Sequence, residues 1–347
     1  MLPLLLYGEI TRAQIAKMLI FGLEGTTLSQ NPKLAETIKR YGLGGVILFG
    51  KNFATPAQVR KLTGDLQALS DTTLLIGIDQ EGGAVDRLAK LPGFPKTPSA
   101  AKMATLPAKS VKARYYQMAL RMQRLGINLN FAPVVDLAIN PQNPVIVRYG
   151  RAYGRDVEKV AQMARYFIDA HRRCGILCTL KHFPGHGSSS QDSHRGFTDV
   201  SGSWQRTELQ VFEKLISGGY GDLVMSAHIY NARLDPENPA TLSYRILHTI
   251  LRQKLHFEGV VITDDMQMGA IGQNYTLDEA IAGAVNAGAD MLLFGNQLAR
   301  PLDPQEVIER ILRLVWAGRI DPARILDANR RIDSLKQKLK TLRERKS

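Results

Sequence analysis

Asp264 and Asp265 close an apolar run, GVVITDDM over residues 259–266. A short apolar run that ends on two acids predicts a buried strand delivering carboxylates to the rim of a pocket. A carboxylate on a rigid strand end can attack the anomeric carbon of a sugar and form a covalent ester, so Asp264 is the candidate nucleophile. In an extended strand Asp265 points to the other side, where it would cap the next segment or orient its neighbours. The alternative is that both acids only cap a helix.

A second polar group, KHFPGHG at residues 181–187, follows another apolar run, and Asp192 and His194 lie just beyond it. Because imidazole titrates near neutral pH, His194 can both donate and accept a proton, and Asp192 could hold one ring nitrogen and tune its basicity. The intervening GHGSSSQ is flexible sequence. It predicts that the pair lies on a mobile loop.

His182 and His186, four residues apart and near Asp192, raise a metal site as an alternative. Pro184 and Gly185 break any helix that would align the two imidazoles. We therefore expect no metal, and we expect Lys181 and His182 to contact ligand hydroxyls.

Acidic and basic side chains elsewhere are candidates for holding a polar ligand. Asp79 begins DQEGG at residues 79–83, and Arg87 follows within reach of the same loop. An acid and an arginine can clamp a ligand, although a surface salt bridge is the alternative. Arg151 lies in YGRAYG at residues 149–154, where the glycines predict a tight loop that presents it to a pocket.

The composition is that of a globular chain with enough apolar sequence for one large core: 347 residues, 44% hydrophobic and 22% charged. The net charge of +13 is partly local, because residues 319–347 hold ten Lys or Arg and four Asp or Glu. Apolar residues recur there at helical spacing, at Ile325, Ile332, Leu335, Leu339 and Leu342. We predict a basic amphipathic helix docked by this stripe. Without a recognition motif, a solvated basic face is favoured over binding to nucleic acid, anionic lipid or an acidic polymer.

Cys174 and Cys178 lie in one apolar stretch and are expected to be core thiols. No segment is long enough to span a membrane, so stable membrane insertion is not expected. The apolar segment Leu2–Tyr7 is shorter than a normal signal-peptide core. We predict a cytoplasmic protein, with a periplasmic or exported one as the alternative if Leu2–Tyr7 is the remnant of a signal peptide.

Short apolar runs alternate with amphipathic segments along the chain. Eight runs predict parallel strands covered on both faces, at residues 18–22, 45–49, 74–79, 127–135, 176–181, 222–228, 259–264 and 290–294. Helical periodicity predicts helices at residues 58–69, 111–125, 157–168, 207–216, 244–255, 278–287 and 304–315. Asp278 and Asp303 are predicted N-caps, and TRAQ at residues 11–14 fits a capping box.

This alternation predicts a (β/α)8 TIM barrel, with a doubly wound open sheet as the alternative. Residues 1–347 are expected to form a single domain, with 319–347 as a C-terminal helical extension. In a barrel of this kind the active site lies on the loops after the strands, and polar residues follow strands three to seven here.

Together these motifs resemble glycoside hydrolase family 3, and within it the single-domain NagZ-type β-N-acetylhexosaminidases. The resemblance runs from GGVILF at residues 44–49 to the end of the eighth strand. The matching motifs are IDQEGG at 78–83, NFAPVVD at 130–136, KHFPGHG at 181–187, DSH at 192–194, MSAH at 225–228, PATLS at 239–243 and TDDM at 263–266.

The resemblance implies a retaining double displacement with Asp264 as nucleophile. His194, paired with Asp192, would be general acid and then general base, where most retaining glycosidases use a carboxylic acid. It further implies no metal or organic cofactor, a monomer, and a carbohydrate substrate that contains N-acetylglucosamine, such as a muropeptide. The residues that would hold the sugar hydroxyls are Asp79, Arg87, Arg151, Lys181 and His182. Departures from the family pattern at Ala84, Ala152, Tyr153, Thr198 and Thr263 bear on which glycan and aglycone are preferred.

Three other functions are consistent with parts of the pattern. A β-glucosidase or β-xylosidase of the same family typically takes its acid/base from an extra domain, so the Asp192–His194 pair favours the N-acetylated sugar. A metal-dependent barrel hydrolase would use His182, His186, His228 and an Asp. A glycan-binding protein without activity would keep the pocket, but the presence of both Asp264 and His194 argues against it.

Overall fold

The fold, described for residues 9–344 by a computed structural model, is a closed eight-stranded parallel barrel in the order β1-β10-β9-β8-β7-β6-β3-β2. The predicted TIM barrel is thus confirmed, and the open doubly wound sheet is excluded. The barrel strands are β1 (Leu19–Gly22), β2 (Gly45–Leu48), β3 (Leu75–Ile78), β6 (Leu129–Asn130), β7 (Leu177–Phe183), β8 (Leu223–Ser226), β9 (Val260–Asp265) and β10 (Met291–Phe294).

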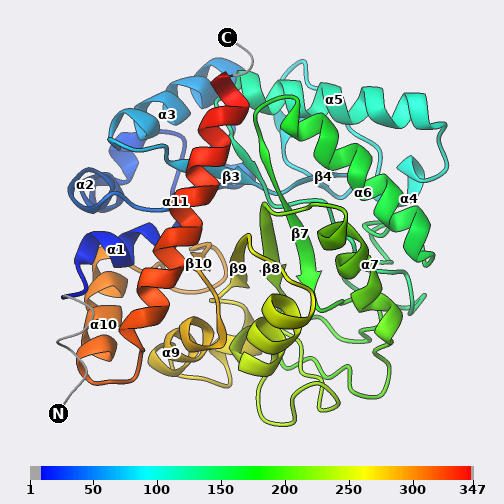
Figure 1. Ribbon diagram of the computed structural model, residues 1–347. Helices are drawn as coiled ribbons and strands as arrows, with labels where there is room; N and C mark the ends of the chain where they lie inside the picture. Colours follow the sequence, from blue (N-terminus) through cyan, green and yellow to red (C-terminus); the bar gives the residue numbers. More distant parts are fainter. Residues whose placement is uncertain (1–8, 345–347) are drawn as a thin grey trace.

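Helices surround the barrel (Figure 1). The α-helices are α1 (Arg12–Lys17), α2 (Pro32–Tyr41), α3 (Pro56–Ala68), α4 (Ala100–Met103), α5 (Ala108–Arg124), α6 (Val157–Arg172), α7 (Arg206–Ser217), α8 (Gly269–Gly272), α9 (Leu277–Ala287), α10 (Pro304–Trp316) and α11 (Pro322–Glu344). A π-helix, η5 (Arg245–Lys254), replaces the helix predicted at 244–255. Short 3-10 turns are η1 (Leu28–Gln30), η2 (Gly50–Asn52), η3 (Leu88–Lys90) and η4 (Ala240–Leu242).

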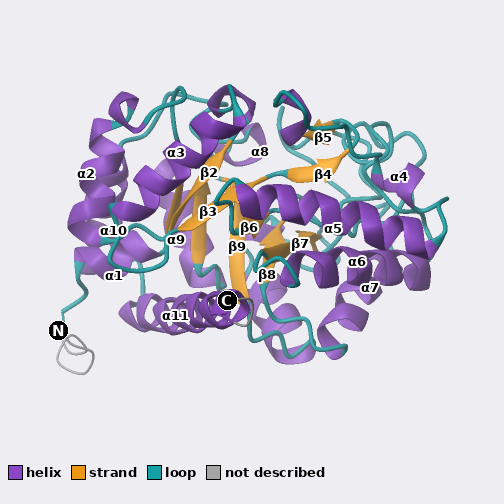
Figure 2. Cartoon of the chain, turned by 90° about the horizontal axis from the view of Figure 1, so that it is seen from above, coloured by secondary structure: helices purple, strands orange, loops and turns teal. Residues whose placement is uncertain are grey.

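The long crossover between β3 and β6 carries a two-stranded antiparallel hairpin, β4 (Gln80–Gly82) and β5 (Val85–Asp86). Its turn needs glycine, because Gly82 and Gly83 have φ angles of 97° and 61°. Figure 2 shows this hairpin on the side of the molecule opposite α11. The crossover therefore adds a wall beside the carboxyl ends of the strands.

Every residue of the eight barrel strands is buried except Asp264. The strands are buried on both faces, by the barrel interior and by the helices, which explains their nearly continuous apolar sequences. The exception marks the place where the barrel opens. Cys174 and Cys178 are buried core thiols, as expected.

Two local predictions were wrong. The fourth strand covers only Leu129–Asn130 rather than 127–135. Pro133 has no N–H to donate to a neighbouring strand. The side-chain oxygens of Asn128 and Asn130 accept the backbone N–H groups of Ile76 and Gln80, which a strand carbonyl would otherwise accept. Thr276, not Asp278, is the N-cap of α9 and forms a capping box with Glu279. The N-cap Asp303 and the capping box at Thr11 are confirmed.

The basic C-terminal helix α11 lies across the amino ends of the barrel strands (Figure 1). Its predicted apolar stripe is buried at Ile325, Ile332, Leu335 and Leu339. Some of its basic side chains form ion pairs with buried aspartates: Lys338 pairs with Asp222, and Arg324 and Arg331 approach Asp290. Both aspartates are completely buried at the amino ends of β8 and β10.

No helix within residues 9–344 combines the length and apolar character that a membrane crossing requires, and Leu2–Tyr7 lies outside the described residues.

Replacing Arg252 with Met tests how strongly the barrel depends on these buried pairs. Arg252 bonds the buried Asp290 carboxylate, which also accepts the Val261 N–H at 2.8 Å. Loss of one partner of a buried ion pair leaves an undercompensated charge, so we expect the free energy of unfolding to fall by about 3 kcal/mol in urea denaturation. The control is Lys61→Met, which breaks the exposed Lys61–Asp65 pair and should cost less than about 1 kcal/mol. Equal costs for the two variants would contradict this account.

Candidate active site

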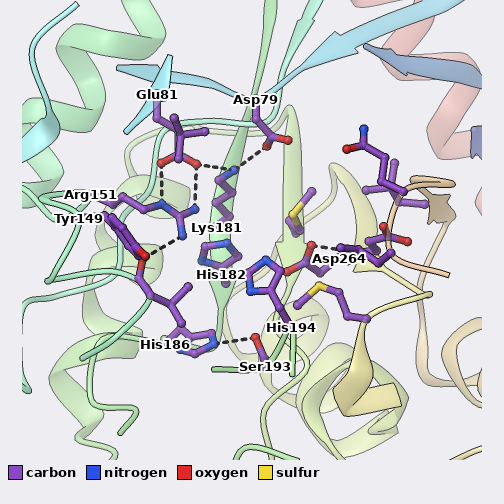
Figure 3. Close-up of a pocket in the computed structure, with 18 of the residues that line it drawn as sticks. Asp79, Glu81, Tyr149, Arg151, Lys181, His182, His186, Ser193, His194 and Asp264 are labelled. Atoms are coloured by element: carbon purple, nitrogen blue, oxygen red, sulfur yellow. Dashed lines mark hydrogen bonds and ion pairs between the residues drawn. The ribbon is translucent and has the colours of Figure 1, made fainter. Parts of the chain in front are cut away.

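All eight residues that the sequence assigned to catalysis or sugar binding line one pocket at the carboxyl ends of the strands. The cavity has a volume of about 430 Å³, within the range of small-molecule sites. The predicted residues are Asp79, Arg87, Arg151, Lys181, His182, Asp192, His194 and Asp264. Figure 3 shows a charged cluster at one end of the pocket and the His194 imidazole beside Asp264 at the other.

Asp264 projects from the end of β9 and accepts the Asp265 backbone N–H at 2.8 Å. Burial by itself raises the pKa of Asp264, but His182, His228 and His194 outweigh it and lower the pKa to about 2. The carboxylate is therefore ionised at neutral pH, as a nucleophile requires.

Asp265 faces a different environment, although it is the next residue. Its Oδ1 accepts the backbone N–H groups of Gln267 and Gly295, both at 3.1 Å. Burial, together with the charge of Asp264, raises the pKa of Asp265 to about 6. Asp265 thus orients the segments after β9 and β10, as predicted for the second acid of the pair.

His194 and Asp192 form the expected pair on the loop after β7. The Nδ1 atom of His194 lies 2.7 Å from Asp192 Oδ1, and the same oxygen accepts the His194 backbone N–H at 3.0 Å. Burial tends to raise the pKa of Asp192, but its hydrogen bonds from His194 lower it below the usual value. With Nδ1 engaged, Nε2 is the ring nitrogen left for proton exchange in the pocket.

The charged cluster joins four side chains from three segments (Figure 3). Lys181 Nζ, on β7, lies 2.8 Å from both Asp79 Oδ1 and Glu81 Oε1. Glu81 also accepts two hydrogen bonds from Arg151, each at 2.8 Å. Burial opposes the ionised form of Glu81, but Arg151 and Lys181 outweigh it and lower the pKa of Glu81 well below its usual range. The cluster stays charged and rigid, because each charge has an opposite partner.

Glu81 is the main residue that the sequence analysis did not select. The expected clamp paired Asp79 with Arg87, whereas the structure pairs Asp79 with Lys181 and Glu81 with Arg151. Arg87 lines the pocket, and its buried Nε has no hydrogen-bond partner among the described residues. The signal for Glu81 was the DQE run, but sequence spacing alone could not say which of its two acids faces Arg151.

Asp136 is a second residue without an assigned role in the sequence analysis. Its Oδ2 lies 2.6 Å from His182 Nδ1, and its Oδ1 accepts the backbone N–H groups of His182 and His186. Burial opposes its ionisation, but His182 outweighs burial and lowers the pKa of Asp136. Asp136 thereby fixes the His182 ring so that Nε2 is directed away from it.

His186 and His228, the other two histidines of the alternative metal site, bond other protein groups. His186 Nε2 lies 3.1 Å from Ser193 Oγ, and burial lowers the pKa of His186 to about 4. His228 bonds Thr241 Oγ1 and the Asp265 carbonyl. Within residues 9–344, no three His, Cys, Asp or Glu side chains are arranged to hold a metal ion.

Several known proteins resemble this chain. A beta-hexosaminidase A from Pseudoalteromonas piscicida is 32% identical over 89% of this chain, which spans only 55% of that relative's length. A beta-hexosaminidase from Pseudomonas aeruginosa is 36% identical over 81% of this chain and 83% of its own. A family 3 beta-N-acetylglucosaminidase from Paenibacillus superposes with a TM-score of 0.87 at 34% identity, covering 96% of this chain and 63% of the other.

The sequence-family model of the glycosyl hydrolase family 3 N-terminal domain matches residues 10–335, which is nearly the whole chain. The barrel, the pocket at its carboxyl end and the motifs around that pocket all fall within this match. The chain belongs to glycosyl hydrolase family 3.

Proposed function

We propose that this family 3 hydrolase releases terminal β-linked N-acetylglucosamine with retention of configuration, through a covalent glycosyl-enzyme on Asp264. The observation that carries the proposal is the meeting of two groups over one pocket. An ionised carboxylate on a rigid strand lies beside an imidazole that is held by its own carboxylate (Figure 3). The names of the similar enzymes support the N-acetylated sugar.

In the first step, an Asp264 oxygen forms a bond to the anomeric carbon as the glycosidic carbon–oxygen bond breaks. His194 delivers the proton that the leaving oxygen needs, from Nε2, because Nδ1 is engaged by Asp192. Asp192 stabilises the imidazolium before transfer and keeps the ring in one orientation. The ionised state of Asp264 at neutral pH favours this attack.

In the second step, the now neutral His194 takes a proton from water, and the resulting hydroxide-like oxygen attacks the anomeric carbon. The ester bond to Asp264 breaks, the carboxylate returns, and His194 is protonated again. Two inversions at the same carbon give net retention. The exposure of His194, 46% for its side chain, suits a group that must meet both a departing aglycone and an incoming water.

The charged cluster at the other end of the pocket would hold the hydroxyls of the terminal sugar. Asp79 can accept hydrogen bonds, Lys181 and Arg151 can donate them, and Glu81 fixes both cations in place. The unpartnered Nε of Arg87 and the Nε2 side of His182 offer further donors. Paired charges with fixed positions orient a sugar at little cost in entropy. We extend the proposal to cell-wall fragments as the natural source of the sugar, as the family resemblance implies.

An aryl β-N-acetylglucosaminide and the matching β-glucoside test the sugar class and the nucleophile together. We expect rapid aryl release from the N-acetylated substrate only, and a loss on the order of 10⁴-fold or more in Asp264→Ala, because the covalent route disappears. Asp333→Ala is the control: Asp333, on α11, pairs at the surface with Lys17 of α1, and the variant should keep full activity. Preference for the glucoside would refute the sugar class, and activity in Asp264→Ala would refute the nucleophile.

His194→Ala tests the acid role through the leaving group. Substrates with poor leaving groups need protonation, so kcat/KM for a phenyl N-acetylglucosaminide should fall by about 100- to 10,000-fold. Dinitrophenolate departs as an anion and needs no proton. For the dinitrophenyl substrate, the fall in kcat/KM should therefore be smaller than for the phenyl substrate, by a factor of about ten or more. The measurement is initial-rate kinetics with both substrates. An equal loss with both leaving groups would rule out His194 as the acid.

A further inference from the structure

The loop that carries Asp192 and His194 contains no strand or α-helix of its own. We define the acid/base loop as residues 184–195, between the end of β7 and the segment that leads to α7. His194 belongs to no strand and its side chain is 46% exposed, so the barrel does not by itself fix the position of the imidazole. The groups that hold the loop therefore decide where His194 lies.

Two buried carboxyl groups hold the stem of the loop. Asp136 Oδ1 accepts the His186 N–H at 2.8 Å, and Glu208 Oε2 accepts the next two, from Gly187 at 2.8 Å and Ser188 at 3.2 Å. Three consecutive backbone amides are thus bonded by side chains instead of a strand partner. The same Glu208 caps α7 by accepting the Gln205 N–H at 3.3 Å, so it joins the loop rigidly to that helix.

The fit around Glu208 is tight. Glu208 is 1% exposed, and a Cβ added to Gly185 would lie 2.5 Å from Glu208 Cβ. Burial raises the pKa of Glu208 to about 7, against the effect of its hydrogen bonds. A carboxyl at such a buried position is unfavourable unless its acceptor capacity is needed, and here its two oxygens accept three N–H groups.

The tip of the loop has its own contacts. Ser193 Oγ bonds His186 Nε2 at 3.1 Å, and the first N–H groups of α8 donate to the His194 and Ser193 carbonyls at 3.2 and 3.1 Å. These contacts join the tip to α8 and to His186, whereas Asp136 and Glu208 bond the backbone of the stem. Glu208 does not line the pocket, so its effect on a sugar would pass through the loop.

We propose that Glu208 is a positioning residue for the general acid/base: it fixes the stem of the acid/base loop and so places His194 against the leaving-group oxygen. This inference rests on the proposed glycosidase function. Glu208 touches neither Asp264 nor the charged cluster in the described contacts, so sugar binding should not depend on it.

The test compares Glu208→Ala with Glu208→Gln, using the phenyl and dinitrophenyl N-acetylglucosaminides. Glu208→Ala should lower kcat/KM for the phenyl substrate by about 100-fold and for the dinitrophenyl substrate by less than about tenfold, since a misplaced acid matters only where a proton is needed. Inhibition by N-acetylglucosamine should stay within about twofold, because the sugar end of the pocket is unchanged. Glu208→Gln keeps one acceptor oxygen and should recover part of the loss. It also provides the measurement if the alanine variant does not fold.

The double variant with His194→Ala separates positioning from general damage. If Glu208 acts through His194, adding a Glu208 substitution to His194→Ala should cause no further loss, because the group it positions is already absent. The matched control is Glu279→Ala, which removes the exposed capping-box glutamate of α9 and should leave both substrates unaffected.

Equal losses with both leaving groups, or losses that multiply in the double variant, would overturn the positioning role while leaving the glycosidase function intact. Wild-type protein that hydrolyses no N-acetylated substrate would overturn the proposed function and this inference with it.

Discussion

Charged groups buried at the two ends of the barrel must be compensated, and this constraint organises the rest of the structure. A low-dielectric interior makes an unpaired charge costly. At the amino ends of the strands, Asp222 and Asp290 are completely buried and meet basic side chains from α6, η5 and α11. At the carboxyl ends, Glu81 bonds both Arg151 and Lys181. The first set of pairs joins the outer helices to the barrel, and the second lines the pocket.

The same constraint explains how two adjacent acids come to differ. Asp264 opens into the pocket and lies near three imidazoles, which lower its pKa to about 2, whereas burial raises the pKa of Asp265 to about 6. Alternation along β9 sends the two carboxyl groups to different surroundings. The strand therefore supplies one ionised group suited to attack and one group that organises the backbone around it.

The proposed acid/base pair depends on a different kind of support. Asp264 is fixed by its strand, but Asp192 and His194 lie on a loop whose stem is bonded by the carboxyl groups of Asp136 and Glu208. Asp136 also holds the His182 ring on the floor of the pocket. Because Asp136 bonds both the His182 ring and the His186 N–H in the stem of the loop, it links the two parts of the pocket at the end of β7.

The sequence by itself predicted the barrel, most of its strands and eight residues that the structure brings to one pocket. It could do so because buried parallel strands have continuous apolar sequences, and polar residues at their carboxyl ends stand out against them. It also predicted that the basic C-terminal helix docks by an apolar stripe. Only the tertiary structure decided the partners. Glu81 rather than Asp79 bonds Arg151, and Asp136 and Glu208 hold the acid/base loop, because these contacts join residues up to 70 positions apart in the chain. The short fourth strand also escaped prediction: local apolar character extended through Pro133, while the ladder needs an N–H that proline lacks.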